Sequence, residues 1–347
     1  MVAVWDMPDF DDHEGVHMFR DHVTGLTAII AIHSTALGPA AGGTRFWRYA
    51  DNIDAVTDAL RLSRGMSYKN AMAGLPAGGG KAVILAPADG AKSPVMLDAF
   101  AHAVDSLGGR YITAQDVGMS VNDMIAISHS TRHVAGLPGQ SGGDPGPSTA
   151  RGVYLGVCAA AERALGRATV SGVHIAIQGV GSVGGGLARW LARAGARLTL
   201  ADADTTRVAA LAHELSATVV TPDEIMTVDA DILCPCALGA TLTSATIAAL
   251  RVTAVAGGAN NQLATADDGA RLAARGILYA PDYVINAGGI INVLRQIDGA
   301  DDAEIDARVD QIPARLNRIW DESAASGATP AEVADTMAQR LIGRQLP

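Results

Sequence analysis

The sequence predicts an α/β protein of two domains, and three observations support this prediction. At 347 residues, the chain is too long for one ordinary hydrophobic core. Apolar runs of strand length alternate with apolar residues at helical spacing, which is typical of sheets covered by helices. The segment GLPGQSGGDPGPST at 136–149 is too rich in glycine and proline to continue a helix or a strand, so it predicts a boundary between the domains.

Strands and helices alternate in the first half of the chain. Apolar runs predict strands over 25–33, 82–85 and 110–114. Helices are expected after Asp51, a good N-cap residue, and over 93–107, where a serine and a proline supply the N-cap and the first helical position. This half is therefore expected to be an α/β domain of its own.

The second half repeats a more regular pattern of strand and helix. A helix over 149–165 precedes it, and the last helix of the chain is expected to start near Thr329. Regular alternation of this kind predicts a parallel, doubly wound sheet of the Rossmann type. The expected strands are 173–178, 197–201, 231–234, 252–256 and 276–280.

A glycine-rich turn joins the first of these strands to the helix after it. Gly179, Gly181 and Gly184 have the spacing that permits a tight turn and lets a pyrophosphate reach the helix N-terminus. Asp202 ends the next strand, where a carboxylate accepts hydrogen bonds from a ribose and repels a 2′-phosphate. The pattern predicts that this half binds NAD rather than NADP, although Arg207 nearby favours the opposite choice, and a glycine turn without a ligand is the alternative.

Charge and cysteine content exclude several classes of protein. The net charge of −10 and the absence of a basic cluster argue against partners such as nucleic acids or anionic membranes. No run of 18 apolar residues occurs and the first residues are acidic, so we expect a cytoplasmic protein. Three cysteines suit a reducing compartment, and the Cys234-Pro-Cys236 run lacks the second ligand pair of a zinc site, so no metal is predicted.

Lysine is rare in this chain, which contains 23 arginines and three lysines. Lysine can lose its proton when it is desolvated, whereas arginine cannot. Lys69 and Lys81 flank the glycines at 78–80, so two cations and open backbone amides predict a carboxylate site and a lysine of lowered pKa. Asp116, after a strand, could exchange a proton with a neighbouring amine. A structural Lys–Asp ion pair is the alternative interpretation.

Asparagines follow two strands of the second half. Ligands collect at the carboxyl ends of parallel strands, so Asn260, Asn261 and Asn286 are candidates for contacts with a nicotinamide or a substrate. Turns rich in asparagine and glycine are common, so this argument is weak when taken alone.

The combined motifs resemble the leucine, valine and phenylalanine dehydrogenases of the glutamate dehydrogenase superfamily. The likeness extends in order along nearly the whole chain. It is carried by ALGPAAGGTRFW (36–47), GMSYKNAMAGLPAGGGKAVI (65–84), GRYITAQDVG (109–118), IQGVGSVG (177–184), CPCALGA (234–240), GANNQL (258–263) and YAPDYVINAGG (279–289).

The resemblance implies an NAD-dependent oxidative deamination that yields a 2-oxo acid, ammonia and NADH. It implies that Lys69 binds the substrate carboxylate together with the backbone of Gly42 and Gly43 and an asparagine of the 260–261 pair. Lys81 would be the general base that activates water, and Asp116 would exchange protons with the amino group. The implied cofactor-binding residues are Thr149, Gly179, Val180, Gly181, Ser182, Val183, Gly184, Asp202, Ala237, Asn260 and Asn286.

The resemblance also implies an order of domains and a homo-oligomer. Residues 1–136 would form the substrate-binding and catalytic domain, and residues 137–326 the NAD-binding Rossmann domain. A C-terminal helix over about 327–347 would return to the first domain. Catalysis would take place as the two domains close and exclude water.

The preferred amino acid depends on the walls of a side-chain pocket. Ala114 and Val293 resemble the branched-chain enzymes, and Ile290 adds bulk on the opposite side. These walls predict leucine, valine and isoleucine as substrates. Ala41 stands where those enzymes typically have leucine, which keeps phenylalanine as the main alternative. A hydroxy-acid dehydrogenase would need a His–Arg pair that has no fitting context here, and a non-catalytic NAD-binding homologue would have no need of Lys81.

Overall fold

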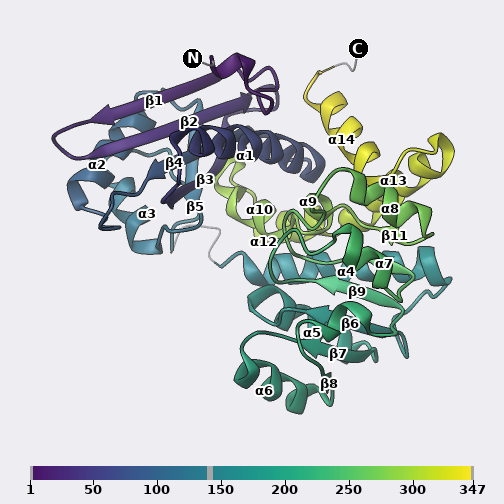
Figure 1. The fold of residues 1–347 in the computed structure, drawn as a ribbon. Helices are drawn as coiled ribbons and strands as arrows, with labels where there is room; N and C mark the ends of the chain where they lie inside the picture. The colour runs from purple at the N-terminus through teal and green to yellow at the C-terminus, as the bar shows by residue number, and fades with distance from the viewer. Residues whose placement is uncertain (1–2, 139–143, 345–347) are drawn as a thin grey trace. The chain divides into compact units, whose positions relative to one another are not determined.

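The computed structural model describes residues 3–138 and 144–344, which form two compact units (Figure 1). Unit 1 holds the described residues of 1–143, 292–301 and 338–347, and unit 2 holds those of 144–291 and 302–337. The division therefore falls seven residues after the expected boundary at 136. Of the C-terminal segment expected to return to the first domain, the part from residue 338 belongs to unit 1.

Unit 1 is built on a mixed five-stranded sheet with the strand order β1-β2-β4-β3-β5. The pairs β1–β2 and β2–β4 are antiparallel, whereas β3 is parallel to both β4 and β5. The prediction identified β2, β4 and β5 but not β1, which carries polar side chains, or β3, which contains two glycines. The strands are β1 (Gly15–Asp21), β2 (Leu26–Ser34), β3 (Ala40–Trp47), β4 (Gly78–Leu85) and β5 (Tyr111–Gln115).

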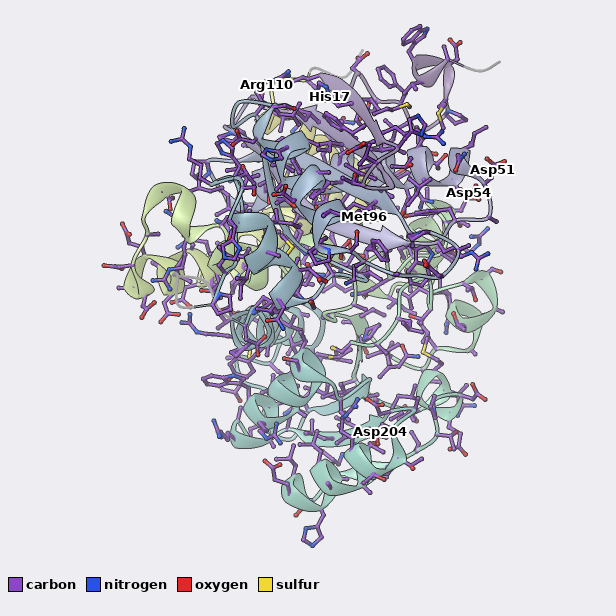
Figure 2. All side chains as sticks on the ribbon, turned by 90° about the vertical axis from the view of Figure 1, so that its left-hand side faces the viewer. His17, Asp51, Asp54, Met96, Arg110 and Asp204 are labelled. Carbon is purple, nitrogen blue, oxygen red and sulfur yellow. The ribbon has the colours of Figure 1, made fainter. Side chains whose placement is uncertain are left out.

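Helices cover both faces of this sheet. Alternation along β2 puts Ile29 and Ala31 in one core with α1 (Asn52–Ala73), and Ile30 and Ile32 in another with α2 (Pro94–Asp105) and α3 (Val121–Ser128). Helix α1 begins as expected, because the Asp51 side chain accepts a hydrogen bond from the Ile53 N–H at 3.0 Å (Figure 2). We call the face of the sheet that packs on α1 the α1 face.

Unit 2 contains a parallel six-stranded sheet with the order β11-β10-β9-β6-β7-β8, which confirms the doubly wound prediction. The chain moves outward from β6 to β8 and then crosses to β9 on the other side of β6. In sheets of this type, ligands bind outside the carboxyl ends of the strands at the point where the order changes direction, here between β6 and β9. The strands are β6 (His174–Gln178), β7 (Arg197–Ala201), β8 (Thr218–Val219), β9 (Ile232–Pro235), β10 (Ala254–Val255) and β11 (Leu278–Tyr279).

Helices alternate with the strands of unit 2, and further helices follow the last strand. Helix α4 starts at Gly146, three residues before the predicted start, and α5 follows the glycine turn. The helices after the boundary are α4 (Gly146–Leu165), α5 (Ser182–Arg193), α6 (Thr205–Leu215), α7 (Ser244–Ala249), α8 (Asp267–Ala274), α9 (Asp282–Ile285), α10 (Gly288–Val293), α11 (Arg295–Asp298), α12 (Asp302–Val309), α13 (Ile312–Ser326) and α14 (Pro330–Leu341), with α11 in unit 1 and α10 and α14 crossing between the units.

The C-terminal residues are tied to the N-terminal part of unit 1. The Arg344 guanidinium donates to the Asp12 and His33 carbonyls at 2.7 and 3.0 Å and lies 3.3 Å from the Asp11 carboxylate. His33 is completely buried, and its Nδ1 lies 2.7 Å from the Ser67 hydroxyl of α1. These bonds fix the last described residue against β2 and α1.

Two further findings concern the classes considered from the sequence. No helix within the ranges 3–138 and 144–344 is long and apolar enough to cross a membrane. Cys158, Cys234 and Cys236 are free, and Cys234 is buried in β9.

Candidate active site

The candidate residues of unit 1 gather on the α1 face of the sheet. Val83 of β4 packs against α1, and Lys81, two residues earlier, points to the same side. The register of the parallel strands pairs Gly43 with Ala114, and Ala41 with Ile112. The prediction therefore identified residues that share one face, although they come from three strands.

Lys81 and Asp116 form a buried ion pair at this face. Lys81 is 5 % exposed, and its ammonium group donates to the Asp116 carboxylate just beyond β5. Gly43 of β3 lies between their strands, and a Cβ atom there would be 2.7 Å from the Asp116 Cβ. A Cβ on Gly42 would be 1.8 Å from the Gly80 carbonyl oxygen. The two glycines are therefore needed for the close approach that forms the pair.

Burial and charge act in opposite directions on this pair. Burial lowers the pKa of Lys81 below its usual value, and the attraction of Asp116 offsets part of that shift. Burial also opposes the charged form of Asp116, but Lys81 and Arg45 outweigh it, so the pKa of Asp116 lies below its usual value. The site thus contains a lysine that gives up its proton more readily than a solvated one.

Arg45 and Asp58 extend this ion pair, and neither is predicted as a site residue from the sequence. Arg45 Nε lies 3.4 Å from Asp116 Oδ2, and Arg45 Nη1 lies 2.6 Å from Asp58 Oδ2. Arg45 stands two residues beyond Gly43, so strand alternation would have placed it on the same face. Nothing in the sequence alone pairs it with Asp58, which lies on α1.

Lys69 lies near the C-terminal end of α1 and is half-buried. Helix α1 packs directly on β4, because a Cβ on Gly79 would be 2.0 Å from the Ser67 backbone nitrogen. The next residue, Asn70, is fully buried and donates to the Gly78 carbonyl at 2.6 Å. Lys69 and Lys81 therefore come from two elements in direct contact.

The predicted wall residues differ in their surroundings. Ala41 is completely buried, whereas Ala114 is 8 % exposed. Val293 is half-buried in unit 1, and its Cγ1 is 3.3 Å from the position of a Cβ on Gly136. Ile290 is half-buried on α10 and belongs to unit 2. A larger side chain at position 41 would thus have to displace neighbours, whereas Ala114 keeps some accessible surface.

The glycine turn of unit 2 has the geometry that its spacing predicts. Gly179 has φ of 90°, a conformation that favours glycine, and a Cβ on Gly184 would be 1.9 Å from the Gly179 carbonyl oxygen. By contrast, a Cβ on Gly181 would have no atom within 4 Å. Gly181 precedes α5, so open space lies where a pyrophosphate would meet the helix N-terminus. Ser182, Val180 and Val183 complete this turn.

Asp202 closes the other side of this turn. Its carboxylate accepts hydrogen bonds from the Val180 N–H at 2.7 Å and the Asp204 N–H at 2.8 Å, and its side chain is 12 % exposed. Arg207 lies 3.0 Å from Asp204 and 3.7 Å from Asp202 (Figure 2 labels Asp204). The charge of Arg207 is therefore matched by two carboxylates, which weakens its attraction for a 2′-phosphate.

Polar residues at the other strand ends lie close together within unit 2. Asn286 is buried and donates to Asn260 Oδ1 at 2.8 Å and to the Gly258 carbonyl at 3.2 Å. Among the described residues its Oδ1 has no partner, so it is a free acceptor that suits a carboxamide donor. Thr149 of α4 packs on the start of α10, with its Oγ1 2.5 Å from where a Cβ on Gly289 would lie. Asn261 is exposed with φ of 52°, and Ala237 packs on Gly179.

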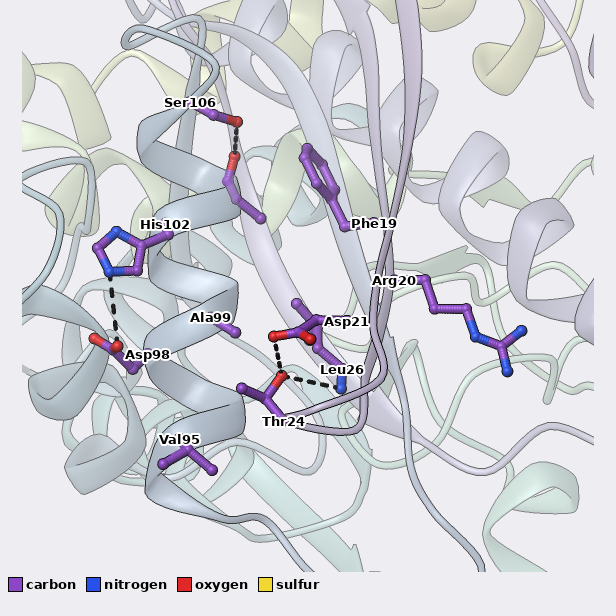
Figure 3. Close-up of a pocket in the computed structure, with 11 residues that line it drawn as sticks. Phe19, Arg20, Asp21, Thr24, Leu26, Val95, Asp98, Ala99, His102 and Ser106 are labelled. Carbon is purple, nitrogen blue, oxygen red and sulfur yellow. Dashed lines mark hydrogen bonds and ion pairs between the residues drawn. The ribbon is translucent and has the colours of Figure 1, made fainter.

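A separate groove lies on the opposite side of the sheet of unit 1. It has a volume of about 550 Å³ and lies between the β1–β2 hairpin and α2 (Figure 3). Its walls include Phe19, Asp21, Asp98 and His102, none of which was predicted as a site residue. This groove is therefore not the candidate active site.

These features define a two-unit α/β protein with a dinucleotide-type turn in one unit and a buried lysine–aspartate pair in the other. Residues 13–133 match the family model described as the dimerisation domain of the Glu/Leu/Phe/Val dehydrogenases. Residues 198–339 match the model described as Glutamate/Leucine/Phenylalanine/Valine dehydrogenase. The chain belongs to this family of amino-acid dehydrogenases.

Individual relatives support the same assignment. The chain is 44 % identical to leucine dehydrogenase of Bacillus subtilis, over 96 % of this chain and 92 % of that one. It is 43 % identical to valine dehydrogenase of Streptomyces coelicolor, over 98 % and 94 % of the two chains. The crystal structure of L-tryptophan dehydrogenase from Nostoc punctiforme matches with a TM-score of 0.87 and 42 % identity, over 95 % and 96 % of the chains. The predicted family is confirmed: the protein is an oxidoreductase that uses NAD.

Proposed function

We propose that this enzyme oxidatively deaminates the branched-chain L-amino acids leucine, valine and isoleucine in a reversible reaction. The observation that carries the proposal is the buried Lys81–Asp116 pair, on the face of the sheet that packs against the helix bearing Lys69. A pair with a purely structural role would not require a second lysine on the helix that packs against the same face. The relatives named leucine and valine dehydrogenase support the substrate class.

Three charged residues of unit 1 have roles in this reaction: Lys69, Lys81 and Asp116. Lys69 binds the substrate carboxylate, assisted by the backbone at Gly42 and Gly43. Bound NAD supplies the hydride acceptor. Once the Cα hydride has left and an imine has formed, Lys81 takes a proton from water as the water oxygen bonds to the imine carbon.

Asp116 then serves the departing nitrogen. It receives from Lys81 the proton taken from water and passes it to the amine of the adduct. The carbon–nitrogen bond then breaks and ammonia leaves, while Lys81, neutral again, takes the proton of the adduct's hydroxyl group as the 2-oxo acid forms. The net reaction consumes one water and NAD and yields ammonium, NADH and one proton. Because the substrate amine and Lys81 must both be unprotonated, the rate of deamination should rise with pH through the alkaline range.

An aromatic amino acid is the second candidate substrate. The relative named L-tryptophan dehydrogenase, 44 % identical over 95 % of this chain, favours it, as does the small side chain at Ala41. Ala114 argues for the aliphatic substrates, because its methyl group fills space that a glycine would leave for a ring. One methylene changes discrimination by only about 1–3 kcal/mol, so these walls favour a class of substrate rather than a single amino acid.

A panel of substrates tests the proposal. NADH formation is measured with L-leucine, L-valine, L-isoleucine, L-phenylalanine, L-tryptophan and L-glutamate, with D-leucine as the control. We expect kcat/KM to be highest for the branched-chain group. A clearly higher value for phenylalanine or tryptophan would overturn the substrate class, and no NADH with any of them would favour a non-catalytic NAD-binding protein.

Two variants test whether the predicted walls of the side-chain pocket set the substrate preference. Ala114→Gly should raise kcat/KM for phenylalanine relative to valine, because it opens space beside the substrate. Ala41→Leu should depress phenylalanine oxidation more than valine oxidation. Equal losses on both substrates would show that position 41 does not line the pocket.

We also propose that the enzyme is a cytoplasmic homo-oligomer. The matched model at 13–133 is described as a dimerisation domain, and the three cysteines are free, as suits a reducing compartment. Light scattering of the purified protein tests the homo-oligomeric state, and a monomer at micromolar concentration would contradict it.

A further inference from the structure

A row of alternating charges leads from the buried lysine toward the surface of unit 1. Lys81 donates to Asp116, whose Oδ2 lies 3.4 Å from Arg45 Nε. The Arg45 Nη1 lies 2.6 Å from Asp58 Oδ2, and the Tyr49 hydroxyl donates to that oxygen at 2.5 Å. Two positive and two negative groups thus alternate, and their formal charges cancel.

The members of this row come from elements that hold them rigidly. Arg45 lies on β3 between the strands that carry Lys81 and Asp116, and Asp58 lies on α1, which covers that face. Only the inner end of the row is buried: the side chain of Lys81 is 7 % exposed, and those of Asp116, Arg45 and Asp58 are each 24 % exposed. The outer end borders a polar surface pocket of about 340 Å³ that Arg45, Tyr49, Asp58 and Arg61 line.

We propose that Arg45 is a positioning residue of the active site: anchored by Asp58, it holds the Asp116 carboxylate in place and shares that carboxylate with Lys81. The proposal rests on the proposed function, in which Lys81 is the base. A carboxylate shared between two cations binds each of them less strongly than a carboxylate that belongs to one. Arg45 therefore keeps the Lys81–Asp116 pair from becoming a permanent, inert ion pair.

The sign of the effect follows from the charges around Lys81. Arg45 lowers the pKa of Lys81 in addition to the larger effect of burial, whereas Asp116 and Asp58 raise it. The Tyr49 phenol has a raised pKa and stays neutral, as does the buried phenol of Tyr111 on β5. Loss of the Arg45 charge should thus raise the pKa of Lys81, and loss of the Asp58 charge should lower it.

The scarcity of lysine makes a direct measurement possible. Protein labelled with ¹³C at the lysine Cε position has three such carbons, at Lys69, Lys81 and Lys92. Lys69→Arg and Lys92→Arg assign the signals by removing one each. The chemical shift of the Lys81 carbon, followed against pH in the full-length protein, then reports the titration of Lys81 whether or not the enzyme turns over.

Three variants decide the proposal. Arg45→Gln should move the titration midpoint of Lys81 upward by about one pH unit, as expected for the loss of a neighbouring cation. Asp58→Asn should move it downward by a smaller amount. Arg61→Gln is the matched control, because Arg61 lines the same pocket but its Nε lies 3.7 Å from Asp9, away from the row. The midpoint should not change in this control.

The outcomes separate charge sharing from a merely structural role. An unchanged or lower midpoint in Arg45→Gln would overturn the proposal, and an unchanged or higher midpoint in Asp58→Asn would remove Asp58 from it. Arg45→Lys keeps the positive charge but not the contacts with both Asp116 and Asp58. The titration midpoint of Lys81 should therefore lie close to that of the wild type. If Arg45→Gln does not fold, Asp58→Asn still gives the sign of the effect of the row on Lys81.

Kinetics supply the second readout. In Arg45→Gln, the rise of kcat with pH should move upward by the same amount as the Lys81 midpoint, so that kcat near neutral pH falls about tenfold. The KM for the amino acid should change little, because Lys69 is not part of the row. If no amino acid is oxidised by the wild type, the proposed function fails while the lysine titration still decides the role of Arg45. If the wild type is active and the midpoint does not move, only the inference fails.

Discussion

The two units of this enzyme form their candidate sites from different groups: mainly backbone atoms in unit 2 and charged side chains in unit 1. In unit 2, the dinucleotide turn is formed by backbone atoms, by missing side chains at Gly179, Gly181 and Gly184, and by one carboxylate. In unit 1, the chemistry depends on charged side chains from three strand regions and a helix. A backbone site follows a local spacing in the sequence, whereas a side-chain site depends on strand register and helix packing.

The largest effect should come from the central side chain of unit 1. Lys81→Ala should lower kcat by about 10²–10⁴-fold, because it removes the proposed base. Lys92→Ala is the matched control, since Lys92 donates to Asp123 and to the Gly118 carbonyl outside the site. Steady-state NADH formation measures both, and a near-normal kcat in Lys81→Ala would show that the base is wrongly assigned.

Two glycines of unit 2 should respond differently to the same change. Gly184→Ala places a Cβ against the Gly179 carbonyl, so the free energy of unfolding should fall by about 1–3 kcal/mol and NAD binding should be lost. Gly181→Ala should change stability by less than about 0.5 kcal/mol, because its Cβ meets no atom, and still weaken NAD binding. Chemical denaturation and NAD titration measure these effects. Normal NAD affinity in Gly181→Ala would contradict the assignment of the open space to the pyrophosphate.

Asp202 should set the choice between cofactors. The wild type should prefer NAD over NADP by at least about tenfold in kcat/KM, which corresponds to about 1.4 kcal/mol. Asp202→Ser should reduce that preference, because it removes the charge that repels a 2′-phosphate and leaves Arg207 less fully paired. Comparable kcat/KM for both cofactors in the wild type would refute this role.

A separate effect, on stability rather than on catalysis, concerns His13 and Asp11 beside the C-terminal residues. Burial lowers the pKa of His13 from 6.5 to about 4, and a hydrogen bond from His33 lowers that of Asp11 from 3.8 to about 2. Both pKa values are depressed on folding, so the unfolded chain binds more protons and stability is lost as the pH falls. The loss runs from pH 6.5 to about 4 for His13 and from pH 3.8 to about 2 for Asp11. The His13 contribution should disappear between pH 6.5 and 4 and amount to about 3 kcal/mol.

The control for this effect is a variant with a side chain at position 13 that cannot titrate. His13→Asn removes the proton site beside the Leu60 carbonyl and the Ser63 hydroxyl, so its unfolding free energy should depend less on pH between 6.5 and 4 than that of the wild type. Equal slopes in denaturation experiments across this interval would remove His13 from the account.

The same contrast explains how much could be predicted from the sequence. The parallel sheet of unit 2, its glycine turn and Asp202 were all predicted, because each depends on residues close in sequence. Strand β3 was missed because glycines at its centre interrupt the apolar pattern. Arg45 and Asp58 were missed because 13 residues separate them, and only the packing of α1 on the sheet brings them together.

The central claim is that unit 2 forms the NAD site without the charged side chains of unit 1. The most direct test is NAD binding by a variant that cannot oxidise its substrate. Lys81→Ala removes a buried side chain of unit 1 and leaves the glycine turn and Asp202 of unit 2 unchanged. Isothermal titration of NAD into wild type and Lys81→Ala should give dissociation constants within about twofold of each other, a difference below about 0.5 kcal/mol. A loss of NAD affinity of about tenfold or more in Lys81→Ala would contradict the account, because the lysine would then belong to the cofactor site.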